Sequence, residues 1–150
     1  MRLILPAFFL LGYVVTISCN AGKVVQVSDE DIAEVVFRFQ IERCYESSPP
    51  KVYFLSLKRN NPTDDFMARF KDSKSPVRKR SQMTGEFIDA ESGERGIVVS
   101  VEKLSSISDT EFKVEGGCVA GGLNGYGFIY SVIRERGTWK VKGSRPTWIS

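Results

Sequence analysis

The glycine-rich segment at residues 116–127, GGCVAGGLNGYG, is the first place where residue types suggest chemistry. Glycines this dense could form a loop that wraps a phosphate group, because glycine lets the backbone approach a ligand closely. Such a loop also needs a helix after the glycines and a lysine followed by serine or threonine. Here segments typical of β-strands flank the glycines on both sides. We therefore predict a hairpin with its tip at Leu123, Asn124 and Gly125.

Ser100 and Lys103 form a second pattern, with the spacing of the serine–lysine pair in penicillin-binding enzymes. That spacing brings two side chains together on a helix, whereas on a strand an odd offset sends them to opposite faces. The surrounding sequence, IVVSVEKL, is typical of a strand. The chain also has no histidine, which removes the usual general base and the commonest metal ligand. We therefore predict a protein without catalytic residues, metal or cofactor.

Residues 1–18 carry a targeting pattern. One arginine precedes a long apolar run without acidic or basic residues, and this run is too short for a membrane-spanning helix. Such a segment is typical of a signal peptide. The residues before Cys19, VTIS, resemble the lipobox of bacterial lipoproteins. The resemblance implies cleavage before Cys19, acylation of that cysteine, and a tether over residues 19–27.

An acylated Cys19 would hold the protein at a membrane, facing the periplasm or the exterior, because each buried methylene adds about 0.8 kcal/mol of membrane affinity. By resemblance to the lipoprotein sorting pattern, Asn20 favours the outer membrane. The alternative is ordinary cleavage after Ala21, which would release a soluble secreted protein. In either case Cys44 and Cys118 would lie in an oxidising compartment, where they could form a disulfide or remain two buried thiols.

The elements that position these residues begin with a predicted helix at residues 28–46. Ser28 suits its N-cap and Asp31 stands three positions on, which is close to a capping box. Pro49 and Pro50 end it. Apolar residues at helical spacing give it a wide buried face: Ile32, Val35, Val36, Phe37, Phe39 and Ile41.

A strand is predicted at residues 51–59 and a second, shorter helix at 62–72, where Pro62 suits the first helical position. From Val77 onward the pattern is β. Short turns between successive strands favour an antiparallel meander. The expected strands cover 76–85, 97–104, 110–116, 125–135 and 138–142, with turns at 91–96 and 106–109, and residues 147–150 end the chain. The predicted fold class is α+β: two helices packed on a curved antiparallel sheet, as one domain over residues 28–150.

This order of elements, with the late segments GYGFIYSVIRE and GTWKVKGSRPTWIS, resembles the nuclear-transport-factor-2-like, or cystatin-like, superfamily. The resemblance covers most of residues 28–150 and implies a cone with a pocket between helix and sheet. The aromatic residues that could line this pocket are Phe39, Phe128, Tyr130, Trp139 and Trp148; simple core packing is the alternative. Tyr130 is the best single candidate, because a buried hydroxyl needs a partner.

The function classes narrow accordingly. A net charge of +3 is too small for a typical nucleic-acid binder. Basic residues between Arg69 and Arg80 could contact anionic lipid or an acidic partner, or simply form a solvated edge. We expect a non-catalytic binding protein for a small apolar or amphipathic ligand. The alternatives are a protein-interaction module of accessory or immunity type, a homodimer through the sheet, and an isomerase or dehydratase, for which Asp89 is the one acid that could point inward.

Overall fold

The computed structural model describes residues 27–46, 48–122 and 124–150. The predicted signal peptide, Cys19 and the tether up to residue 26 lie outside these ranges, as does Leu123. The described chain is α+β, as predicted: two α-helices accompany a six-stranded sheet and a two-stranded sheet. No helix in these ranges is long and apolar enough to span a membrane.

Helix α1, Asp29–Arg43, begins with the predicted capping box. The backbone N–H of Asp31 donates to the Ser28 hydroxyl at 3.2 Å, and the Asp31 carboxylate accepts from the Ser28 N–H at 3.1 Å. Acidic residues in the first turn also lie at the positive end of the helix dipole. The helix ends at Arg43, three residues before the predicted end, and Cys44 is its C-cap.

Helix α2, Asp64–Ala68, is shorter than the predicted helix. Thr63 caps it, because its hydroxyl accepts the N–H of Phe66 at 3.2 Å. Phe66 is fully buried and meets Phe37 of α1 at 6.0 Å between ring centroids. Arg69 then forms ion pairs with three acids near the start of α1, Glu30, Asp31 and Glu34.

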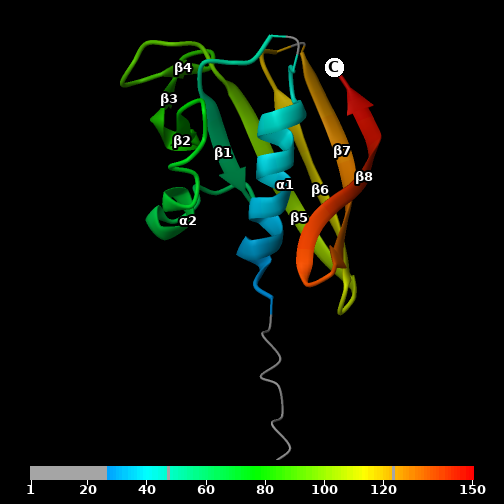
Figure 1. The fold of residues 1–150 in the computed structure, drawn as a ribbon. Helices are drawn as coiled ribbons and strands as arrows, with labels where there is room; N and C mark the ends of the chain where they lie inside the picture. The colour runs from blue at the N-terminus through cyan, green and yellow to red at the C-terminus, as the bar shows by residue number, and fades with distance from the viewer. Residues whose placement is uncertain (1–26, 47, 123) are drawn as a thin grey trace, which may run out of the picture.

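The large sheet has the strand order β2-β1-β5-β6-β7-β8 (Figure 1). Strands β5 to β8 form an antiparallel meander, as predicted. The strands of the large sheet are β1 (Tyr53–Leu57), β2 (Val77–Lys79), β5 (Ile97–Ser108), β6 (Glu111–Val119), β7 (Gly125–Glu135) and β8 (Thr138–Ile149). The small sheet pairs β3 (Met83–Thr84) with β4 (Ile88–Asp89).

The prediction of an entirely antiparallel sheet is wrong for β1 and β2. Strand β1 pairs in parallel with both β2 and β5. The chain between β1 and β2 contains α2, so it crosses over and re-enters the sheet in the same direction. Long connections of this kind permit parallel neighbours, whereas the short turns between β5 and β8 do not.

Three details of the predicted strands are also wrong. The stretch 76–85 is broken by the 3₁₀ turn Arg80–Gln82, because side chains of Gln82 and Asn61 accept the N–H groups of Lys79 and Ser81. The expected turn at 106–109 begins only at Asp109, since Ser106 and Ser108 still belong to β5 and pair with β6. The strand expected at 138–142 extends to Ile149 as β8, which bulges against β7 at two places.

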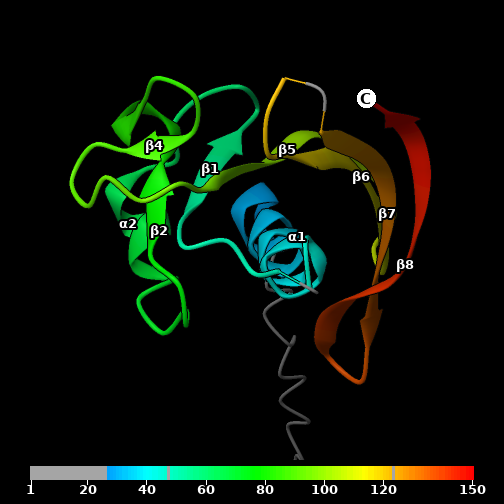
Figure 2. The ribbon, with the colours of Figure 1, turned by 90° about the horizontal axis from the view of Figure 1, so that it is seen from above.

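The large sheet bends around α1, which lies against its concave side (Figure 2). Alternation along the strands sends one set of side chains towards the helix and the other set outward. The helix-facing set joins the core, whose largest fully buried members include Ile32, Val36, Phe37, Leu55, Phe66, Val99, Val101, Val114 and Tyr130. A second, smaller cluster of Val52, Phe54 and Val98 lies apart from it.

The glycine-rich segment is a hairpin, which confirms the prediction. Strand β6 ends at Val119, and Gly125 begins β7 rather than forming the tip. The backbone N–H of Ala120 donates to the carbonyl of Asn124 at 2.8 Å across the connection. A strand therefore follows the glycines, and no helix N-terminus is placed there to receive a phosphate group.

A disulfide joins Cys44 to Cys118, with the two Cα atoms 6.5 Å apart. It connects the C-cap of α1 to β6, across a sequence separation of 74 residues. The end of the helix is therefore fixed to the middle of the sheet both by packing and by a covalent bond.

Candidate ligand cavity

A cavity of about 880 Å³ opens between the C-terminal end of α1 and strands β7 and β8. Its volume lies within the range of about 300–1,000 Å³ that is usual for small-molecule sites. The lining residues are Phe39, Gln40, Arg43, Cys44, Tyr45, Glu46, Tyr126, Phe128, Tyr130 and Ser144.

Aromatic rings form much of the wall. Strand alternation places Tyr126, Phe128 and Tyr130 of β7 on the side that faces α1. The rings of Phe39 and Tyr130 meet edge to face at 5.9 Å, and those of Phe128 and Tyr130 lie 5.8 Å apart. Three of the residues proposed from sequence, Phe39, Phe128 and Tyr130, are thus brought together in one cavity.

The two tryptophans lie elsewhere. Trp139 packs edge to face on Phe112 at 5.4 Å, at the other end of β8, so it is part of the core margin and does not line the cavity. Trp148 packs over Gly127. Because Gly127 lies between Tyr126 and Phe128 in β7, Trp148 lies on the face of the sheet opposite to the side chains of these two residues. The hydrophobic pattern correctly predicts that Trp139 lies in a β-strand. It does not show that neither tryptophan lines the cavity with Phe39, Phe128 and Tyr130.

The floor of the cavity is polar, and its central residue is Gln40, which is fully buried. Its amide nitrogen Nε2 donates to the carbonyl of Ser100 at 2.9 Å and to the hydroxyl of Tyr130 at 3.2 Å. Its carbonyl oxygen Oε1 is buried and has no hydrogen-bond partner within the described residues. Gln40 therefore lines the cavity and retains one buried acceptor without a partner in the described residues.

The sequence analysis missed Gln40, because a glutamine in an amphipathic helix is usually on the wet face. A signal was present. Gln40 stands four residues after Val36 and three after Phe37, so it shares their stripe. A polar side chain on a buried stripe must form hydrogen bonds inside the protein, because otherwise its removal from water destabilises the fold.

Tyr130 is only 2 % exposed. Burial raises the pKa of its phenol above the ordinary value, and the hydrogen bond from Gln40 offsets only part of this effect. The hydroxyl is therefore neutral at physiological pH. It accepts a hydrogen bond from Gln40, and Tyr130 lines the cavity beside it.

The rim is held by the chain that follows α1. The hydroxyl of Tyr45 donates to the backbone carbonyl of Asn124 at 3.1 Å, and its ring meets Tyr126 at 6.1 Å. Tyr45 has a φ of 62°, a left-handed conformation that turns the chain away from the helix. Because Cys44 is bonded to Cys118, this turn is anchored to the sheet.

Acid–base groups are sparse around the cavity. Glu46 is the one carboxylate among its lining residues, and that side chain is 69 % exposed and lies 3.6 Å from Arg43. Asp89 is buried, as considered from sequence, but it lies in β4 and outside the cavity lining. Burial would raise the pKa of Asp89, yet hydrogen bonds from Ser92 and the charge of Arg78 hold it below the ordinary value.

Within the same described ranges, no group of three or more histidine, cysteine, aspartate or glutamate residues could hold a metal ion. The arrangement around Gln40 and Tyr130 can therefore bind and orient a small molecule, with aromatic contacts and a few hydrogen bonds. Comparison of this chain with protein-family models, with curated proteins and with solved structures gives no match.

Proposed function

We propose that this protein is an exported, lipid-anchored binding protein that holds a small apolar or amphipathic ligand in the cavity between α1 and β7. One observation carries the proposal: aromatic walls surround a buried acceptor, Oε1 of Gln40, that has no partner in the described chain. Cavities of this kind, mostly apolar with few polar groups, are typical of ligand sites.

The free acceptor indicates the polarity of the ligand. An unsatisfied buried acceptor costs about 1–3 kcal/mol, so a ligand that supplies an O–H or N–H group regains much of that energy. The amide orientation is fixed, because Nε2 already donates to the carbonyl of Ser100. A ring-containing molecule with one hydroxyl or N–H group therefore suits this site best.

The arrangement of α1 on the concave side of a bent sheet supports membership of the nuclear-transport-factor-2-like superfamily as part of this proposal. Anchoring at Cys19 is supported by the sequence before it. The intact mass of the exported protein tests the anchor: we expect a chain that begins at an acylated Cys19. A mature chain that begins at Gly22 would instead support a secreted protein.

Binding is proposed rather than catalysis, because the groups at the cavity suit no acid–base step. The carboxylate of Glu46 is solvated and paired at the rim. The phenol of Tyr130 has a raised pKa and is a poor base at neutral pH.

The binding test is a titration with N-phenyl-1-naphthylamine, an apolar fluorescent probe that carries one N–H group. We expect enhanced emission from the wild type and about tenfold weaker binding by Ser144→Trp, which fills the cavity mouth. Thr138→Trp, at the exposed start of β8, is the matched control and should bind like the wild type. Absence of probe uptake by the folded wild type would contradict the proposal.

A further inference from the structure

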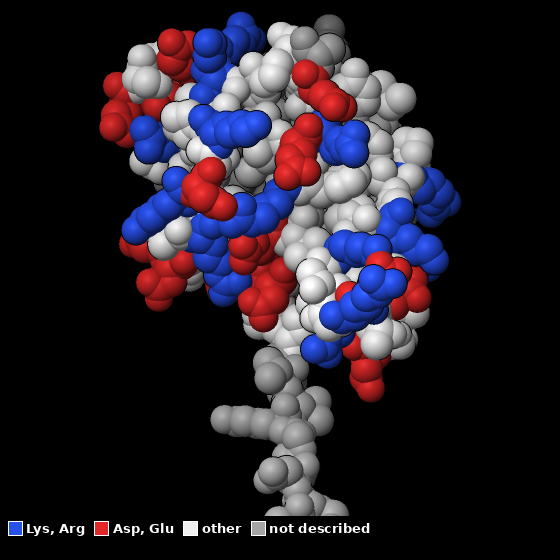
Figure 3. Space-filling view, in the orientation of Figure 1, with Lys and Arg blue, Asp and Glu red and all other residues white. Residues whose placement is uncertain are grey.

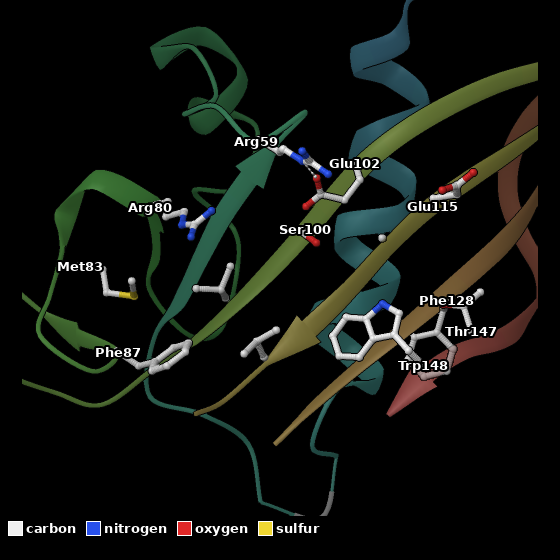
Figure 4. A pocket seen from close by; sticks show the side chains of 13 residues that line it. Arg59, Arg80, Met83, Phe87, Ser100, Glu102, Glu115, Phe128, Thr147 and Trp148 are labelled. Atoms are coloured by element: carbon white, nitrogen blue, oxygen red, sulfur yellow. Dashed lines mark hydrogen bonds and ion pairs between the residues drawn. The ribbon is translucent and has the colours of Figure 1, made fainter. Parts of the chain in front are cut away.

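A second hollow, of about 590 Å³, lies on the face of the sheet turned away from α1 (Figure 4). Its floor is the outer surface of β5 and β6, at Val98, Ser100 and Val119. Met83 and Phe87 border it on one side and Trp148 on the other. Phe128 is the one residue that lines both this hollow and the cavity described above.

The indole of Trp148 packs directly on the backbone of two glycines of β7, Gly125 and Gly127. A methyl group on Gly127 would overlap the five-membered ring of the indole, and one on Gly125 would lie 3.0 Å from its six-membered ring. The indole therefore spans both glycines and lies flat along the strand. One face of the ring is covered by backbone, and 47 % of the residue remains exposed.

The rim of the hollow carries charges of both signs. Arg59 donates to the carboxylate of Glu102 at 3.1 Å, and Glu115 lies 3.8 Å from Lys103. Arg80, on the side of Met83, has no ion pair within the described ranges. On the face drawn in Figure 3, which is the side of α1, positive and negative groups are also mixed. The hollow is therefore not built for a strongly anionic or strongly cationic ligand.

We propose that this hollow is a second binding site, for a neutral saccharide. A sugar ring has one face of C–H groups, which can pack on the exposed face of Trp148, and an edge of hydroxyl groups. Those hydroxyls both donate and accept, so they match the carboxylates of Glu102 and Glu115 and the guanidinium of Arg80. A purely apolar ligand would desolvate these charged groups without compensation. This inference does not depend on the proposed function of the other cavity.

The experiment titrates the full chain by calorimetry with three neutral oligosaccharides: chitohexaose, cellohexaose and maltohexaose. We expect at least one to bind, with a loss of about tenfold or more in Trp148→Ala and smaller loss in Trp148→Phe, which keeps an aromatic face. Trp139→Phe is the control, because that tryptophan lies outside the hollow. Ser144→Trp, which blocks the other cavity, should leave saccharide binding unchanged.

Three outcomes would overturn this assignment. The first is that none of the three sugars binds to the folded wild type. The second is that Trp148→Ala, with an unchanged circular dichroism spectrum, binds as tightly as the wild type. The third is that sedimentation shows a dimer that Trp148→Ala dissociates, since the hollow would then be a contact between two copies of the chain.

Discussion

The phenolic oxygen of Tyr130 lies 3.2 Å from the side-chain nitrogen of Gln40, a residue 90 positions earlier in the chain. The same nitrogen reaches the carbonyl of Ser100 in β5. One buried carboxamide thus connects the helix to two strands and forms the floor of the candidate cavity.

Replacing Gln40 with leucine should lower the free energy of unfolding by about 1–3 kcal/mol, because the carbonyl of Ser100 loses its donor while remaining buried. Urea unfolding measures this change. Glu42→Leu is the matched control on the exposed side of the same helix and should change stability by less than about 0.5 kcal/mol. Equal effects of the two substitutions would show that the carboxamide is not a structural link.

Stability should fall in alkaline solution. Burial raises the folded-state pKa of Tyr130, Tyr45 and Tyr53 above the ordinary value of a tyrosine. The unfolded chain therefore ionises first, so this stability is complete below pH 10 and is lost as pH rises towards the folded pKa values. Tyr130→Phe should make the alkaline loss shallower, as measured by urea unfolding at pH 8 and pH 11. An unchanged slope would contradict the burial of this phenol.

Stability should also fall in acid solution, because Asp89 becomes protonated there. Although burial opposes ionisation, hydrogen bonds from Ser92 and the charge of Arg78 hold its folded pKa below the ordinary value of an aspartate. The stability that it contributes is present above about pH 4 and is lost as pH falls through the folded pKa. Asp89→Asn should therefore be less stable than the wild type at pH 7, and the difference should shrink near pH 2. A difference independent of pH would argue against this ion pair.

The disulfide should contribute about 4 kcal/mol for a loop of this length, on the chain-entropy model. Reduction, or replacement of Cys44 and Cys118 by alanine, should lower the denaturant midpoint accordingly. A reductant should have no further effect on the double alanine variant. If reduction leaves the wild-type midpoint unchanged, the two sulfur atoms are not bonded in solution.

Gly127→Ala should cost about 1–3 kcal/mol, the usual range for overpacking, because a methyl group there collides with the indole of Trp148. The intrinsic fluorescence of Trp148 should shift as its ring is displaced. Gly143→Ala is the matched control, because a methyl group on Gly143 of β8 would meet no atom within 4 Å. In Trp148→Ala the cost of Gly127→Ala should largely disappear.

Local signals predicted the local structure well. The cap at Ser28 and the stripe after it located α1, and strand alternation with short turns located the meander from β5 to β8. The same alternation brought Phe128 and Tyr130 to one face. These features depend on residues close together in the chain.

Features that depend on distant residues were not predictable in the same way. The parallel direction of β1 follows from its pairing of Tyr53 with Ile97, which local patterns do not encode. The glycine-rich segment predicted only a hairpin, yet Gly127 provides space for Trp148, which is 21 positions later. The contact of Trp139 with Phe112 likewise joins residues far apart in the chain.

The packing of α1 against the last strands also determines when the protein can fold. The helix is made first, but it contacts β6, β7 and β8, which leave the ribosome last. Until the final dozen or so residues emerge, its apolar face has no complete sheet to cover it. The nascent chain therefore remains unfolded until synthesis is almost finished. During that time the apolar face of α1 is exposed to chaperones and other binding factors.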